Sequence, residues 1–248
     1  MSAIEVAAQP GLHYKETDEV LERLANEGFC EEKIGLSSKS PRRGIRAPVS
    51  WRGQEVCVKN VCVYCGSRKG NDPAWELAAR ELGREMASRG MGLVFGGGAV
   101  GLMGVIADEI LGAGGEVVGV IPWGLSSTEV TNEAVTELIH CDTMHERKAL
   151  MEKRSDGFIA MPGGYGTLDE LFEILTWSQL GLHRKPVGVF NTGGFFDHLL
   201  TYLDETTERG FISRAHRDII KASADPVEML DAMEAYEPEH GAIWSVEP

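Results

Sequence analysis

The feature that most constrains the fold is a regular alternation, from Val58 onward, between short β-branched runs and longer segments with apolar residues at helical spacing. This alternation is typical of βαβ units, in which a helix crosses over between two parallel strands. The predicted strands are Asn60–Tyr64, Gly92–Phe95, Glu116–Ile121, Ala134–His140, Gly157–Met161 and Pro186–Phe190. The predicted helices lie near Pro73–Arg89, Leu102–Ala113, Met144–Arg154, Leu168–Leu180 and Phe195–Arg209. We therefore expect an α/β fold with an open, mostly parallel sheet and helices on both faces.

The first 56 residues do not follow this alternation and predict a separate N-terminal extension. They contain one amphipathic pattern, Thr17–Asn26, followed by the polar and basic stretch Ser37–Gly44. The pattern indicates a short helix and the stretch indicates a flexible linker. We expect an extension over residues 1–56 that packs on the protein or covers a dimer interface, followed by one α/β domain over residues 57–248.

The acidic composition argues against a nucleic-acid partner. The chain has 38 acidic and 24 basic residues, which gives a formal net charge of −14, so its surface repels polyanions on average. A small phosphate can still bind, because local backbone amides and one or two basic side chains outweigh a distant field that salt screens. No apolar run approaches the roughly 20 residues of a membrane span, so we expect no membrane insertion.

The five cysteines predict a reducing, cytoplasmic environment. Their number is odd, and the N-terminus lacks the apolar core of a signal peptide. Cys62 and Cys65 form a C-x-x-C motif, a candidate redox or half-zinc site, but no second Cys/His pair stands at ligand spacing. We therefore predict no metal site.

Ligands of open parallel sheets bind beyond the carboxyl ends of the strands, so the loops that follow strands carry the functional argument. The loop Gly96–Gly104 contains five glycines in nine residues, including Gly97 and Gly98. Ordering a glycine costs roughly 0.5–1 kcal/mol of folding free energy relative to alanine. Five glycines in one loop therefore indicate a close approach of the backbone to a phosphate. The loop is neither a dinucleotide fingerprint, which belongs on the first strand, nor a Walker loop, which requires Gly-Lys-Ser/Thr.

Two other loops follow predicted strands and admit two interpretations each. In Cys65–Gly70, a glycine followed by Ser67 lets amides and a hydroxyl approach a phosphate or ribose, but a plain turn with Asp72 or Asn71 capping the next helix explains it equally well. In Met161–Glu170, Gly163, Gly164 and Gly166 precede a helix. There, Thr167 and Glu170 fit a capping box, whereas beside a bound nucleotide the Glu170 carboxylate would lie next to the ribose.

A basic pair lies in the segment Met144–Met151, just after the fourth predicted strand. Arg147 and Lys148 are adjacent and so point about 100° apart on a helix. They are either a solvated pair or, beside phosphate loops, a source of a guanidinium fork for an anion. His145 fits a surface or hydrogen-bonded histidine better than a catalytic one.

Four motifs taken together resemble the LONELY GUY family of cytokinin riboside 5′-monophosphate phosphoribohydrolases, once misnamed lysine decarboxylases. They are Cys65-Gly66-Ser67, Gly96-Gly97-Gly98-x-x-Gly101-Leu102-Met103-Gly104, Met144-His145-x-Arg147-Lys148 and Pro162-Gly163-Gly164-x-Gly166-Thr167-x-x-Glu170. The resemblance covers about Asn60 to Lys221 and includes Thr176–Gly181 followed by Lys185–Val187. Any one glycine loop is a weak signal, but four motifs in order are a specific one.

The resemblance implies a Rossmann-like fold that hydrolyses the N-glycosidic bond of a nucleoside 5′-monophosphate to free base and ribose 5-phosphate, without metal or organic cofactor. It implies that Arg147 and Glu170 are the catalytic pair. The residues that it implies around the substrate and its phosphate are Ser67, Gly97, Gly98, Met144, Lys148, Gly163, Gly164, Gly166 and Thr167. Glu170 would stabilise the oxocarbenium-like ribose and help position water, while Arg147 would either orient Glu170 or stabilise the leaving base. A homodimer is expected, with higher oligomers also known in the family.

Two departures and three alternatives accompany this resemblance. The first 56 residues have no counterpart in short family members, and Arg68 stands where a small residue is common. A general AMP nucleosidase would use the same residues, and so would a nucleotide-binding protein without catalysis, although the presence of both Arg147 and Glu170 argues against the latter. Amino-acid decarboxylation would need a pyridoxal lysine, and no identifiable site for one is present.

Overall fold

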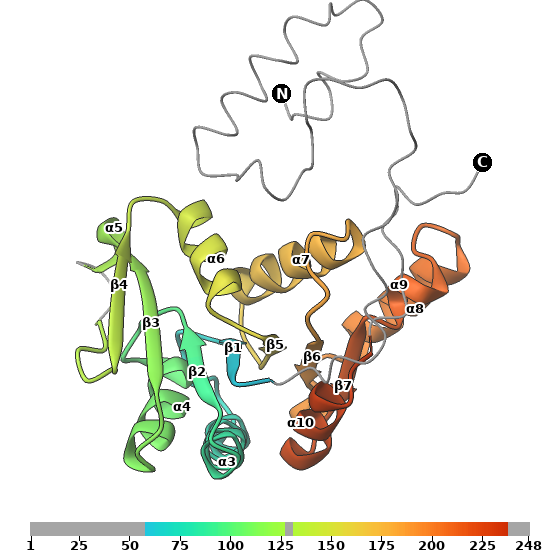
Figure 1. The fold of residues 1–248 in the computed structure, drawn as a ribbon. Coiled ribbons are helices and arrows are strands. Elements are labelled where there is room, and N and C mark those ends of the chain that lie inside the picture. The colour runs from blue at the N-terminus through green and yellow to red at the C-terminus, as the bar shows by residue number, and fades with distance from the viewer. Residues whose placement is uncertain (1–57, 127–130, 238–248) are drawn as a thin grey trace, which may run out of the picture. The chain divides into compact units, whose positions relative to one another are not determined.

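The computed structural model describes residues 58–126 and 131–237. The predicted N-terminal extension and its helix, Thr17–Asn26, lie outside the described residues. Within the described ranges the chain forms a seven-stranded sheet in which every neighbouring pair is parallel (Figure 1). The strands are β1 (Asn60–Tyr64), β2 (Gly92–Phe95), β3 (Val117–Pro122), β4 (Glu137–Cys141), β5 (Gly157–Ala160), β6 (Val187–Phe190) and β7 (Ile220–Ser223). The α/β prediction is confirmed.

The strand order is β4-β3-β2-β1-β5-β6-β7. The chain builds outward from β1 to β4 and then returns to place β5 on the other side of β1. The carboxyl ends of β1 and β5 therefore flank the point where the order reverses, which is where open parallel sheets bind ligands. The fold thus places the loops after β1 and β5 side by side at the predicted site.

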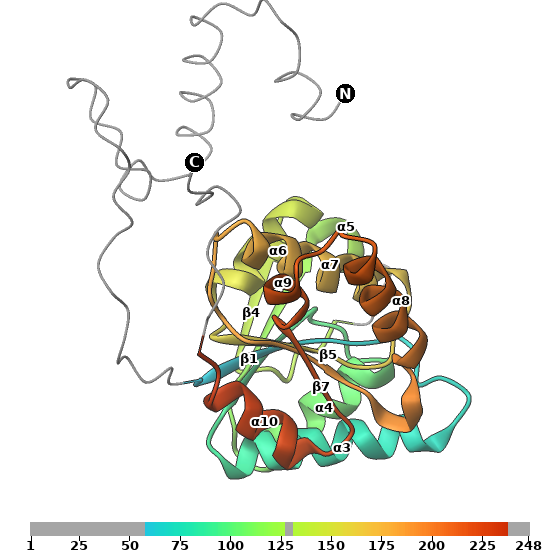
Figure 2. The same cartoon turned by 90° about the vertical axis from the view of Figure 1, so that its right-hand side faces the viewer.

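Helices cover both faces of the sheet (Figures 1 and 2). One face carries α3 (Pro73–Ser88), α4 (Gly101–Gly112) and α10 (Pro226–Glu234), and the other carries α6 (Met144–Lys153), α7 (Tyr165–Gln179) and α8 (Asp197–Glu208). Short elements are α5 (Trp123–Ser126), the 3₁₀ turn η2 (Thr192–Gly194) and α9 (Arg214–Arg217). The buried side chains accordingly form two clusters, one around Leu82, Ile106 and Met229 and the other around Met151 and Leu171.

The sequence pattern missed β7 and α10 at the C-terminal end and the short elements α5, η2 and α9, and it placed the start of one strand three residues early. Strand β7, with the sequence Ile-Lys-Ala-Ser, is a four-residue edge strand with one buried position, so it lacks the apolar run used to predict strands. Helix α10 follows it directly. Strand β4 begins at Glu137 rather than Ala134, because Asn132 Oδ1 accepts a hydrogen bond from Ala134 N (3.1 Å) and forms a turn there.

The C-x-x-C motif is structural. Cys62 and Cys65 are free and buried, and their side chains pack in the two different core clusters on opposite faces of the sheet. Burial raises the pKa of both thiols, which keeps them protonated and unreactive. Among the described residues, no three His, Cys, Asp or Glu side chains gather as they would around a metal ion. Nor does any helix of residues 58–126 and 131–237 have the length and apolar character needed to cross a membrane.

Candidate active site

Three glycine-containing loops contact one another at the carboxyl edge of the sheet. The amide of Gly66, after β1, donates to the carbonyl of Pro162, after β5 (3.0 Å). The carbonyl of Gly66 accepts from the amide of Leu102, in the first turn of α4 (3.0 Å). Gly101 has φ +68°, and a methyl group on it would collide with the backbone of the Ser67 loop. The convergence of the loops therefore depends on glycine at this position.

Helix α7 begins three residues earlier than predicted, and the capping-box interpretation is wrong. The helix starts at Tyr165, and its N-cap is Gly164, which offers no side-chain cap. Thr167 thus lies inside the first turn, 3% exposed, where its hydroxyl would meet a methyl group added to Gly163. Glu170 lies one turn further along the helix and faces the protein interior. Its carboxylate is therefore free of a capping role.

The structure brings Arg147 of α6 and Glu170 of α7 together as predicted. Arg147 Nη1 lies 3.4 Å from Glu170 Oε1, and both side chains are buried, at 7% and 9% exposure. Arg147 Nε donates to the carbonyl of Val120 (3.0 Å), and Nη2 donates to the carbonyl of Gly96 (3.1 Å). Two fixed carbonyls therefore hold the guanidinium, and the Nη1 edge points at the carboxylate.

Gly96 is a residue of this site that the sequence reasoning did not single out. A methyl group on Gly96 would occupy the space of Arg147 Nη2. The position immediately after β2 thus has to be glycine for the Arg147 guanidinium to reach the two carbonyls. Its signal in the sequence is the first glycine of the Gly96–Gly104 loop, whose glycines as a group predict phosphate binding.

Glu170 is poised to change protonation state near neutral pH. Burial raises its pKa to about 7, the positive charge of Arg147 opposes the increase, and the neighbouring Asp169 and Glu173 add to it. The largest effect is desolvation, because the carboxyl group lies between α7 and the sheet with little access to water. A carboxyl with this pKa is typical of groups that handle protons or developing positive charge.

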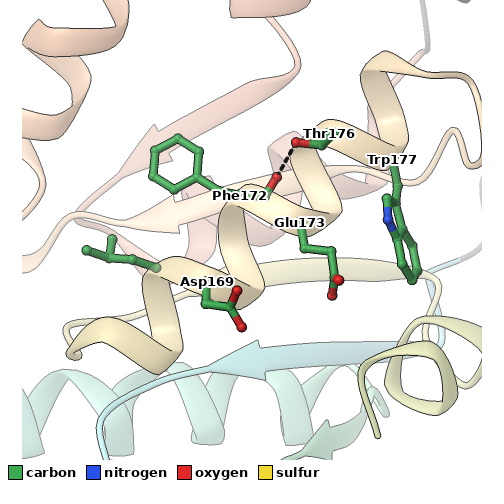
Figure 3. Close-up of a pocket in the computed structure, with 6 residues that line it drawn as sticks. Asp169, Phe172, Glu173, Thr176 and Trp177 are labelled. Atoms are coloured by element: carbon green, nitrogen blue, oxygen red, sulfur yellow. Dashed lines mark hydrogen bonds between the residues drawn. The ribbon is translucent and has the colours of Figure 1, made fainter. Parts of the chain in front are cut away.

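Lys148 connects α6 to the outer side of α7. Its Nζ lies 3.0 Å from Asp169 Oδ2 and 3.1 Å from Glu173 Oε1. These two carboxylates border a shallow pocket of about 360 Å³ along α7 (Figure 3). The pocket is lined by Leu168, Asp169, Phe172, Glu173, Thr176 and Trp177. Among the described contacts, Lys148 therefore fixes α6 against α7 rather than reaching the phosphate loops.

The other predicted residues lie at the same edge with different environments. Gly97 has φ +77°, and its carbonyl accepts from Asn132 N (2.9 Å), while Gly98 forms a bridge with Thr131. Ser67 and Met144 are exposed after β1 and β4, and among the described residues no hydrogen bond or ion pair joins either to the Arg147–Glu170 pair. His145 is also exposed, as its surface interpretation predicted.

The starts of α4 and α7 differ from those of the other long helices on these faces. Side chains cap α3 (Asp72), α6 (Thr143) and α10 (Asp225). The capping alternative for the loop after β1 is thereby confirmed for Asp72, whose Oδ1 accepts from Ala74 N (2.9 Å). Helix α8 has no side-chain cap but carries Asp197 in its first turn, whereas α4 and α7 have neither a side-chain cap nor an acidic residue there. At α4 the Leu102 amide is already bound to the Gly66 carbonyl, so the other first-turn amides and the positive dipole ends of both helices remain available to an anion.

Comparisons with known proteins match the chain to one family. The family described as "Possible lysine decarboxylase" matches residues 103–233. A probable cytokinin riboside 5′-monophosphate phosphoribohydrolase of Oryza sativa subsp. japonica is 46% identical over 192 residues, covering 77% of this chain and 91% of that protein. A cytokinin riboside 5′-monophosphate phosphoribohydrolase of Arabidopsis thaliana is 48% identical over 191 residues, covering 77% and 90%.

Solved structures share the fold at lower identity. The molybdenum cofactor binding protein from Rippkaea orientalis superposes with a TM-score of 0.55 at 22% identity, covering 71% of this chain and 95% of that one. The Moco carrier protein from Chlamydomonas reinhardtii gives 0.53 at 23% identity, covering 70% and 93%. These likenesses establish the Rossmann-like fold alone. By its sequence relatives, the chain belongs to the LONELY GUY family of cytokinin riboside 5′-monophosphate phosphoribohydrolases.

Proposed function

We propose that this protein hydrolyses the N-glycosidic bond of adenosine 5′-monophosphates, N6-modified ones included, and releases the free base and ribose 5-phosphate. The observation that carries the proposal is the buried Arg147–Glu170 pair (3.4 Å), one helical turn from the uncapped start of α7. The 46–48% identity to the phosphoribohydrolases supports it. The roles that the resemblance implies for the individual residues remain our proposals.

In this mechanism the start of α7 binds the phosphate, and Glu170 acts at the ribose. The free amides around Gly163–Thr167 favour a phosphate at the helix N-terminus. Glu170 follows one turn later on the same helix, so a ribose that extends from this phosphate can place its anomeric carbon near the carboxylate. As the base departs, the ionised carboxylate stabilises the positive charge on the ribose and orients the attacking water.

Arg147 acts in this proposal by holding Glu170 in position. Of its guanidinium nitrogens, Nε and Nη2 are bound to the carbonyls of Val120 and Gly96, and Nη1 faces the carboxylate. The fixed positive charge favours the ionised form of a carboxyl group that burial would otherwise keep protonated. This geometry favours the orienting role over direct contact with the leaving base.

The test of the proposed function is release of ribose 5-phosphate from AMP and from isopentenyl-AMP, assayed separately with purified protein. Because the curated relatives are named for cytokinin riboside 5′-monophosphates, we expect kcat/KM to be higher for the prenylated nucleotide. Equal values for the two substrates would instead favour the general AMP nucleosidase. No release from either would contradict hydrolysis and leave a nucleotide-binding protein.

The pH dependence of kcat/KM should report Glu170, because kcat/KM reflects ionisations of the free enzyme. Because its carboxylate is the proposed active form and its pKa lies at about 7, protonation below this pH removes activity. We expect kcat/KM for AMP to fall about tenfold per pH unit below pH 6 and to level off above pH 8. A rate that falls as pH rises through 7 would show that the protonated carboxyl is the active form and overturn this assignment.

We further propose a cytoplasmic homodimer that needs no cofactor and binds no nucleic acid. The odd number of cysteines supports the location, and the formal charge of −14 supports the absence of nucleic acid. The apolar residues Leu168, Phe172 and Trp177 along the outer pocket of α7 support a subunit interface there. Light scattering that gives a monomer mass at assay concentrations would contradict the dimer.

A further inference from the structure

Arg68 lies in the loop after β1, which is hydrogen-bonded to the start of α4 and to the loop before α7. The loop that contains it is tied to the loop before α7 through the Gly66 amide and the Pro162 carbonyl (3.0 Å). It is tied to α4 through the Leu102 amide and the Gly66 carbonyl (3.0 Å). A methyl group on Gly101, the first residue of α4, would lie 2.5 Å from Arg68 N. The Arg68 backbone is therefore in contact with the start of α4 and two residues from the link to the α7 loop.

The two loops that lead into α4 and α7 contain no cation. Gly96–Gly104 and Met161–Glu170 have neither lysine nor arginine. A phosphate dianion bound there, on a protein of formal net charge −14, gains stability from a nearby positive side chain. A cation that contacts this phosphate therefore has to come from another part of the carboxyl edge.

Among the nearby basic residues, Arg68 is the one without a partner in the described part of the chain. Arg147 and Lys148 are buried against carboxylates, and Lys69 pairs with Glu76 (2.8 Å). Arg68 is exposed, and no hydrogen bond or ion pair joins it to another residue of the described ranges. Its guanidinium is thus free to turn toward a ligand at the two helix starts.

We propose that Arg68 binds the 5′-phosphate of the substrate. This inference rests on the proposed function. The planar guanidinium matches two phosphate oxygens at once, while the amides of α7 donate to the others. Neither the sequence motifs nor the names of the relatives assign a role to Arg68.

The test is the binding of ribose 5-phosphate by calorimetry, with ribose as the neutral comparison. We expect Arg68→Ser to raise the Kd for ribose 5-phosphate roughly 10-fold to 100-fold, the loss expected for a charge-assisted contact. Arg68→Lys keeps the positive charge but cannot bind two phosphate oxygens at once, so its Kd should lie between those of the wild type and Arg68→Ser. Arg209→Ser removes an exposed arginine at the C-cap of α8, whose ion-pair partner in the described part of the chain is Glu205, and should leave the Kd unchanged.

Kinetics with AMP separate this inference from the proposed function. In Arg68→Ser, KM for AMP should rise by the same factor as the Kd while kcat is retained. If the wild type cleaves AMP and Arg68→Ser has the same KM and the same Kd for ribose 5-phosphate, the role of Arg68 is overturned and the proposed function stands. If ribose 5-phosphate binding depends on Arg68 but no nucleotide is cleaved, the phosphate contact stands and the proposed function fails.

Discussion

Glu170→Gln should lower kcat for AMP roughly 1,000-fold, within the range of about 10²–10⁴ attributed to a positioned catalytic carboxyl group. Glutamine has almost the same shape, so the Arg147 contact at 3.4 Å loses its charge but not its geometry. The neutral amide can neither stabilise a positively charged ribose nor accept a proton from water. The measurement is single-turnover release of ribose 5-phosphate at pH 8, where the wild-type carboxyl group is ionised.

The matched control for this variant is Glu205→Gln on α8, which makes the same change at an exposed residue that pairs with Arg209. It should retain wild-type kcat. Near-normal turnover in a folded Glu170→Gln protein would remove Glu170 from the mechanism, whatever the pH profile shows.

Glu170→Gln should also change how the free energy of unfolding depends on pH. The pKa of Glu170 in the folded protein, about 7, lies above its ordinary value of 4.5. The folded state therefore binds a proton that the unfolded state has already released, and the associated stability is present below pH 4.5 and lost as pH rises through 7. Between pH 4.5 and pH 8, the free energy of unfolding of the wild type should fall by on the order of 3 kcal/mol relative to that of Glu170→Gln. Parallel pH profiles of unfolding for the two proteins would contradict a raised pKa.

Gly96→Ala should lower kcat roughly 100-fold by displacing the Arg147 guanidinium. The added methyl group would take the space of Arg147 Nη2, and it would also lie 3.2 Å from Met103 Sδ. The guanidinium must then leave the carbonyls of Gly96 and Val120, and Glu170 loses the charge that orients it. Gly96 does not have a positive φ, so backbone strain does not explain the loss.

The control for Gly96→Ala is Gly112→Ala at the end of α4, where an added methyl group meets nothing within 4 Å. It should keep normal kcat. If Gly96 acts through Arg147, the effects of Gly96→Ala and Arg147→Lys on kcat should be far from additive in the double variant. Additive effects would show that Gly96 acts independently of Arg147.

Local patterns in the sequence determined the order of elements and the location of the site. Strand and helix periodicity depends on which neighbours along the chain share a face, so six strands and the glycine loops that follow β1, β2 and β5 were predictable. Parallel strands then required the carboxyl-end loops to meet at one edge. The pairing of Arg147 with Glu170 came from the resemblance of four motifs, since 23 residues of sequence separate the two side chains.

Only the tertiary structure decided how these residues are held. The start of α7 at Tyr165 overrides the Thr167–Glu170 capping pattern, because packing against the sheet turns Glu170 inward. The need for glycine at position 96 follows from a guanidinium on α6, a contact that no local pattern records. The pKa of Glu170 likewise depends on burial among distant segments. Secondary structure reflects short-range preferences, whereas contacts and desolvation depend on which distant segments the fold brings together.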